Sequence, residues 1–168
     1  VGDMVDSIVI ENDGMFTETT YESVEDVTAL SKEEIIEKVK NAGVVGMGGA
    51  GFPTHVKLSP KEPDKIEYII ANCAECEPLL KLHRQVLETH PREIFEALDL
   101  ISKAVNAERV CVAVKKSYVR TLEAISPLTE FFPNIEICRI DDIYPAGDEV
   151  ILTYEITGRI VPPGAIPL

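Results

Sequence analysis

A glycine-rich run is the part of this sequence whose residue types and spacing most suggest ligand chemistry. It contains four glycines within six positions, namely Gly46, Gly48, Gly49 and Gly51. Glycines in such number disfavour a helix, because each loses backbone entropy on ordering and offers no side chain to pack. A loop with bare N–H groups can close around an anionic or planar ligand, and a helix starting directly after it would add its positive dipole end. Lys57 can add a positive charge, so we expect a phosphate or nucleotide loop that follows neither the Walker nor the G-x-G-x-x-G pattern. A flexible surface loop is the alternative.

A second patch combines a short apolar run with polar residues at its end. Residues 66–72 are rich in isoleucine and lie between two prolines, which predicts a buried strand. Asn72, Glu75 and Glu77 follow at the carboxyl end, where ligands bind in open α/β sheets. Carboxylates there can accept hydrogen bonds from ribose or ribityl hydroxyls, whereas they would repel phosphate. A solvated loop charge is the alternative for Glu77.

Further apolar runs predict the sheet that must position these residues. Residues 109–114 read as a continuous apolar strand covered on both faces, and residues 135–140 read as a third strand. Helical patterns at 79–88, from Pro91 onward and at 117–130 separate the strands. This order predicts an α/β fold with right-handed crossovers, a mostly parallel sheet and helices on both faces. Its carboxyl edge would gather the Asn72 segment, Lys115, Lys116 and the loop at 141–149.

The N-terminal part of the chain predicts less regular structure. A strand or hairpin is expected at 5–10 with a turn at 11–14, and a turn also at 60–64. Ser31 and Glu34 fit a capping box, so a helix should begin there and stop at Gly43.

Composition excludes several classes of partner. Within 168 residues, 29 acidic and 16 basic side chains give a net charge of −13, which argues against nucleic acid. No apolar stretch reaches the roughly 20 residues that cross a bilayer, so we expect no direct membrane insertion. The four cysteines should be free thiols. Cys73 and Cys76 form a C-x-x-C pair without further ligands, and Cys111 and Cys138 stand singly in predicted strands, so we expect no metal site.

The glycine run at 46–57 and the segment at 72–78 together resemble the flavin-binding core of the complex I flavoprotein (NADH-binding) subunit superfamily. Within it, they are most similar to the C subunit of Rnf-type electron transport complexes and to related cobalamin reductases. Residues 144–149 and 158–164 extend the resemblance, and residues 7–14 resemble the end of a preceding β domain.

This resemblance implies a Rossmann-like FMN-binding fold and a set of ligand contacts. Residues 1–28 would be the end of the preceding β domain and an acidic connector. Residues 29–168 would be the flavin and NADH domain, incomplete at its C-terminus. The FMN contacts it implies are Gly46, Gly48, Gly49, Lys57, Asn72 and Glu75. The NADH contacts it implies are Gly51, Phe52, Glu77, Tyr144, Asp148 and Glu149. Met47 and Ala74 depart from the arginine and aspartate of complex I subunits.

The resemblance also implies an activity. NADH would reduce FMN, and electrons would leave one at a time to 4Fe–4S clusters outside these residues. Because the flavin performs that chemistry, no catalytic side chain is required here, and these residues alone should be inactive. The resemblance implies a cytoplasmic protein held at the inner face of the membrane by other subunits of an electron transport complex. The alternatives are a reductase subunit for another acceptor, such as a corrinoid or an amino-acid reductase system, and a cofactor-less interaction domain of the same fold.

Overall fold

A three-stranded parallel sheet forms the centre of the protein. The computed structural model describes residues 4, 6–18, 20, 23–48, 50–60, 66–77 and 79–165. The strands are β1 (Tyr68–Asn72), β2 (Arg109–Lys115) and β3 (Ile135–Ile140), in the spatial order β1-β2-β3. Both pairings are parallel. The predicted parallel sheet is therefore confirmed.

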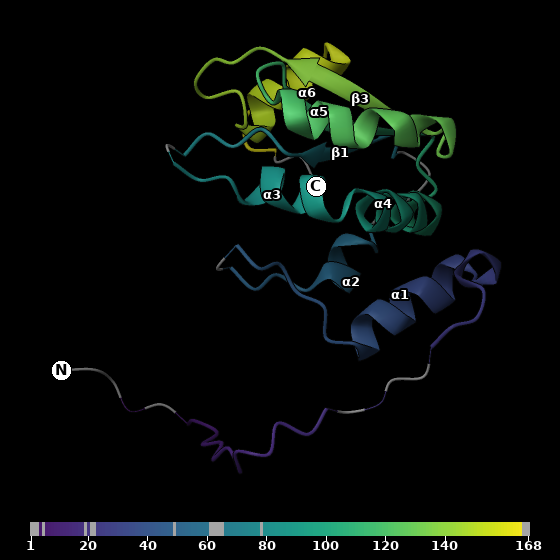
Figure 1. Cartoon of the computed structure of the whole chain (residues 1–168), viewed down its shortest axis with the longest axis vertical. Helices are drawn as coiled ribbons and strands as arrows, with labels where there is room; N and C mark the ends of the chain where they lie inside the picture. Colours follow the sequence, from purple (N-terminus) through teal and green to yellow (C-terminus); the bar gives the residue numbers. More distant parts are fainter. Residues whose placement is uncertain are drawn as a thin grey trace.

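Helices cover both faces of this sheet (Figure 1). On one face, α3 (Leu82–Thr89), α4 (Pro91–Val105) and α5 (Val119–Ile125) pack over Val110, Val112 and Val114 of β2. On the other face, Leu152 of α6 (Glu149–Thr157) packs with Ala113 and Ile140. Side chains alternate between the two faces of a strand. Because helices cover both faces, every residue of β2 after Arg109 is buried. This two-sided cover explains why β2 has a continuous apolar sequence.

The N-terminal half of the chain adds a separate helical layer. After the 3₁₀ turn η1 (Val27–Ala29) comes α1 (Lys32–Asn41), which begins with the predicted Ser31–Glu34 capping box. The single turn α2 (Thr54–Lys57) packs against α1, and α1 packs against α4. Gly43 has a φ of 66°, a left-handed conformation that ends the helix as predicted.

Two sequence predictions were wrong in detail. Residues 6–10 form no strand, and Ile8, Val9 and Ile10 are exposed. A strand forms only where another strand pairs with its N–H and C=O groups. Within the described residues no strand pairs with residues 6–10. The predicted helix at 117–130 is α5 followed by the 3₁₀ helix η3 (Ser126–Glu130), because Pro127 cannot donate an α-helical hydrogen bond. The predicted turn at 60–64 lies, except for Pro60, outside the described residues.

Candidate functional site

Asn72 fastens the carboxyl end of β1 to the loop before α6. Its Nδ2 donates a hydrogen bond to the Gly147 carbonyl oxygen at 2.7 Å, and its Oδ1 accepts one from the Ala74 N–H at 3.2 Å. The structure thus brings the predicted segments 72–77 and 144–149 into direct contact. Both polar groups of the Asn72 side chain are already bonded within the protein, so its clearest structural role is to hold these two segments together.

Gly147 is the residue on which these two segments interlock. Its N–H donates to the Cys76 Sγ at 2.9 Å, while its carbonyl accepts from Asn72. A Cβ at this position would lie 2.0 Å from the Ala74 carbonyl oxygen and 2.9 Å from the Cys76 Sγ. Backbone therefore approaches backbone here at a distance that only glycine permits.

The two glutamates of this edge have different surroundings. The Glu75 carboxylate pairs with Arg84 Nε at 3.2 Å and accepts from the His83 N–H at 2.9 Å, and its side chain is only 5% exposed. Arg84 in turn lies over the Tyr118 ring, 4.2 Å from its centre. The Glu77 side chain is exposed and has no hydrogen bond or ion pair with any residue that the structure describes. Arg84 forms an ion pair with Glu75 and none with Glu77, and this difference sets the two carboxylates apart. The sequence analysis did not identify Arg84.

The start of α6 carries three of the predicted nucleotide contacts. Asp148 accepts hydrogen bonds from the N–H groups of Val150 and Ile151, both at 3.0 Å, so its carboxylate caps the helix. Tyr144 is 81% exposed, and Glu149 is exposed in the first turn. Neither side chain bonds to another within the described part of the chain. Tyr144 and Glu149 are thus available to a ligand, whereas Asp148 supports the helix.

The two lysines at the end of β2 are held by the loop that follows β3. Lys115 Nζ lies 3.2 Å from an Asp142 carboxylate oxygen, and Lys116 pairs with Asp141. The Ser117 hydroxyl also donates to Asp142 at 2.5 Å. This hydrogen bond and Lys115 lower the pKa of Asp142 below its ordinary 3.8. These charges tie β2 to the 141–149 loop.

The glycine loop is closed at its base and open at its tip. The Gly46 N–H donates to the Phe52 carbonyl at 2.8 Å, and the Thr54 N–H donates to the Val44 carbonyl at 3.0 Å. Gly46, Gly48, Gly51 and Phe52 are all exposed. A Cβ on Gly48 would meet no atom within 4 Å. Gly49 lies outside the described residues.

Lys57 ends the single turn α2 that directly follows this loop. Its side chain is exposed and has no bonded partner among the described residues. In Figure 1 the glycine loop and the segment between β1 and α3 extend toward the side to which the strand arrows point. No hydrogen bond or ion pair joins the two in the described part of the structure.

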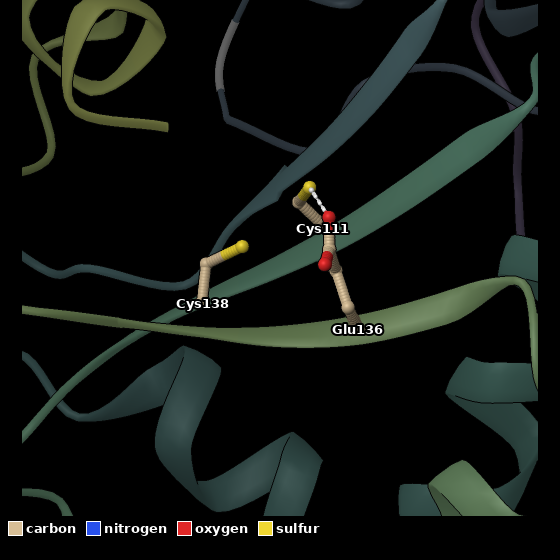
Figure 2. A group of neighbouring side chains, drawn as sticks. All are labelled: Cys111, Glu136 and Cys138. Carbon is tan, nitrogen blue, oxygen red and sulfur yellow. Dashed lines mark hydrogen bonds between the residues drawn. The ribbon is translucent and has the colours of Figure 1, made fainter. Parts of the chain in front are cut away.

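The cysteines fall into two pairs. Burial, and secondarily the Glu75 charge, raise the pKa of Cys73 to about 11, so its thiol stays protonated and unreactive at neutral pH. The Cys76 sulfur accepts a hydrogen bond from the Gly147 N–H. Cys111 and Cys138, which we expected to stand singly, instead lie together with Glu136 on β2 and β3 (Figure 2). The expectation of no metal site did not take this cluster into account, and it stays a prediction.

Comparison with known proteins identifies the family. Residues 39–168 match the model of the Nuo51 FMN-binding domain. The chain belongs to this family. This Nuo51-family chain is 40% identical over 149 residues to the cobalamin reductase PduS of Salmonella typhimurium, covering 89% of the chain and 31% of the relative. It is 36% identical over 170 residues to the C subunit of the Na⁺-translocating ferredoxin:NAD⁺ oxidoreductase complex of Acetobacterium woodii, covering 99% of the chain and 38% of the relative.

A solved structure agrees with this assignment. The fold of the Nuo51-family chain is similar to a chain of an NAD⁺-reducing [NiFe]-hydrogenase in the H₂-reduced state. The TM-score is 0.68 at 26% sequence identity, over 80% of this chain and 26% of that one. The resemblance to the complex I flavoprotein superfamily and to the Rnf-type C subunit is thus confirmed. The chain spans about a third of the length of the curated relatives it matches. None of the described helices is long and apolar enough to cross a membrane.

Proposed function

We propose that this Nuo51-family chain binds FMN and NADH within an electron-transfer subunit that oxidises NADH and passes electrons to iron–sulfur clusters elsewhere in the protein. The observation that carries the proposal is the family match over residues 39–168. In this proposal residues 29–168 belong to one flavin and nucleotide domain, and other subunits of an electron transport complex are its partners. Those subunits would hold it at the inner face of the cell membrane.

The glycine loop has the chemistry to hold the phosphate end of FMN. Its exposed backbone at Gly48 can approach a ligand closely, because the space beside Gly48 is open, whereas the Gly46 N–H is already bonded to Phe52. Lys57 supplies a positive charge that no described residue neutralises. Because α2 is a single turn, its dipole adds little. We assign phosphate binding to the loop backbone and Lys57.

The residues at the carboxyl edge of the sheet are of two kinds: some hold the backbone in place, and others have side chains that can contact a ligand. Asn72, Glu75 and Asp148 have their polar groups bonded internally, so in this proposal they fix the backbone around the flavin. The exposed side chains that remain free for the nucleotide are Phe52, Glu77, Tyr144 and Glu149. The Glu77 carboxylate would accept hydrogen bonds from ribose hydroxyls. Bound FMN would supply the conversion from two-electron to one-electron transfer, and these residues would bind and orient its partners.

A second candidate function is reduction of a corrinoid. It is favoured by the 40% identity to a protein named as a cobalamin reductase. The flavin and nucleotide sites would be the same, and only the electron acceptor would differ. NADH-dependent reduction of a cobalamin, measured against reduction of a ferredoxin by the same intact protein, separates the two.

Substitution of Gly48 tests the flavin site directly. Gly48→Val adds a branched side chain where no protein atom lies within 4 Å, so the fold should tolerate it while the ligand cannot approach. We expect the intact variant to purify with little FMN and an unchanged unfolding midpoint. The matched control is Ala42→Val, at an exposed position before the loop, which should keep full FMN content. Normal FMN content in Gly48→Val would refute the assignment of this loop. A wild type that never binds FMN would favour the cofactor-less interaction domain.

A further inference from the structure

A group of metal-ligating side chains that the proposed flavin site does not use lies on strands β2 and β3. Cys111 of β2 is directly opposite Glu136 of β3, and Cys138 follows Glu136 by two residues. Because side chains two residues apart point to the same face of a strand, all three project to one side of the sheet. Figure 2 shows the Cys138 sulfur directed toward the other two side chains.

The three side chains are close enough to share one ion. The Cys111 Sγ lies 3.1 Å from the Glu136 Oε1, and the three ligand atoms lie within 4.8 Å of one another. Zinc binds sulfur at about 2.3 Å and oxygen at about 2.0–2.2 Å, so its tetrahedral ligands stand about 3.5–3.8 Å apart. Small rotations of the side chains therefore suffice to bring all three onto one ion. We propose that Cys111, Glu136 and Cys138 form a zinc site that joins β2 to β3, with water as the fourth ligand.

The ligand types select zinc among common cations. Two thiolates suit borderline and soft ions, and a mixed sulfur and oxygen set suits tetrahedral Zn²⁺. Magnesium and calcium require oxygen ligands. The two thiols release their protons to solvent as they bind, and the carboxylate is already ionised.

The surroundings balance the charge of such a site. Two thiolates and one carboxylate carry three negative charges, and Zn²⁺ together with Arg109 carries three positive charges. Arg109 Nη2 lies 2.7 Å from the Glu136 Oε1, so it holds the carboxylate in place as outer-shell partners of metal ligands do.

The burial of the cluster suits a site with one open position. Cys111 is fully buried, Cys138 is half-buried and the Glu136 side chain is 46% exposed. The ion can therefore enter from the Glu136 side, and water can reach the fourth position from there. Cys138 pairs with Ala113, which pairs with Asn72, so β2 lies between the Cys138 end of this site and Asn72, and Cys111 lies two residues nearer the start of β2.

Zinc content of the intact protein tests the proposal. After dialysis against zinc and removal of free metal, we expect one zinc ion per chain in the wild type by mass spectrometry of the metal. Cys138→Ala and Cys111→Ala should lose this ion. Glu136→Gln should weaken zinc binding, measured against a coloured chelator, by at least the roughly 10–100-fold that loss of an outer-shell partner costs. The control Cys73→Ala removes a partly buried thiol elsewhere and should keep the zinc.

A second measurement needs no variant and so does not depend on variants folding. In the wild type, zinc should protect Cys138 from alkylation, and a chelator should expose it, while Cys73, whose raised pKa keeps its thiol protonated, stays unlabelled in both states. Zinc content in Cys138→Ala equal to that of the wild type would overturn the proposal. A wild type that takes up no zinc, with Cys138 alkylated equally with and without it, would overturn it as well.

Discussion

Replacing Gly147 by alanine tests whether the strand-end motif and the loop before α6 are locked together. The added Cβ would lie 2.0 Å from the Ala74 carbonyl oxygen, far inside van der Waals contact. The neighbouring atom is backbone, so it cannot rotate away. Overpacking of this kind costs about 1–3 kcal/mol. Moving the loop instead would break the hydrogen bonds to Asn72 and Cys76, each worth about 1 kcal/mol.

We therefore expect Gly147→Ala to lose about 2–3 kcal/mol of unfolding free energy. For a chain of this size the melting temperature would fall by about 4–12 °C. Urea unfolding followed by circular dichroism measures the loss, and Gly48→Ala is the matched control because its Cβ meets no atom within 4 Å. If Gly147→Ala unfolds within about 0.5 kcal/mol of wild type, as ordinary surface substitutions do, the interlock described for this edge does not exist.

Two further predictions concern charged groups of the same edge. Glu75→Gln should lower the unfolding free energy by about 1–3 kcal/mol, because the substitution weakens the bonds of a buried carboxylate to Arg84 and to the His83 N–H. Glu77→Gln should leave the unfolding free energy unchanged. Equal urea midpoints for the two variants would contradict this prediction. The pKa of Asp142 is lowered in the folded state, so its contribution is complete above its ordinary pKa of 3.8 and is lost as the pH falls below that value through the folded pKa. Melting temperatures between pH 6 and 3 should therefore fall less steeply for Asp142→Asn than for wild type, and parallel curves would count against the Asp142 contacts.

The sheet could be predicted from the sequence because β2 is a continuous apolar run and helical patterns separate it from β1 and from the isoleucine-containing β3. Burial on both faces requires such runs, and parallel crossovers follow from their order. Whether residues 6–10 form a strand could not be predicted from such patterns. Residues 6–10 have strand-forming side chains, but a strand also depends on a partner, and composition carries no information about that partner.

The candidate site was predictable at the level of segments but not of contacts. The Asn72 and Tyr144 segments were expected at one edge, and they meet there through Gly147. Which acidic group is free was not predictable, because that depends on Arg84 folding back onto Glu75 from nine residues away. The Cys111–Glu136–Cys138 cluster was missed because it depends on the register between β2 and β3. The only sign of this cluster in the sequence was that Glu136 and Cys138 are two residues apart in a predicted strand and therefore share a face.

Anaerobic titration of the intact protein with NADH tests the central claim most directly. The account predicts that bound flavin loses its oxidised absorbance on addition of NADH. It also predicts that Glu77→Gln keeps its FMN but binds NADH about ten- to hundredfold more weakly, as loss of hydrogen bonds to a charged acceptor implies. Wild-type behaviour of Glu77→Gln would remove Glu77 from the site and leave the function standing. Flavin that is bound yet never reduced by NADH would contradict the proposed function itself.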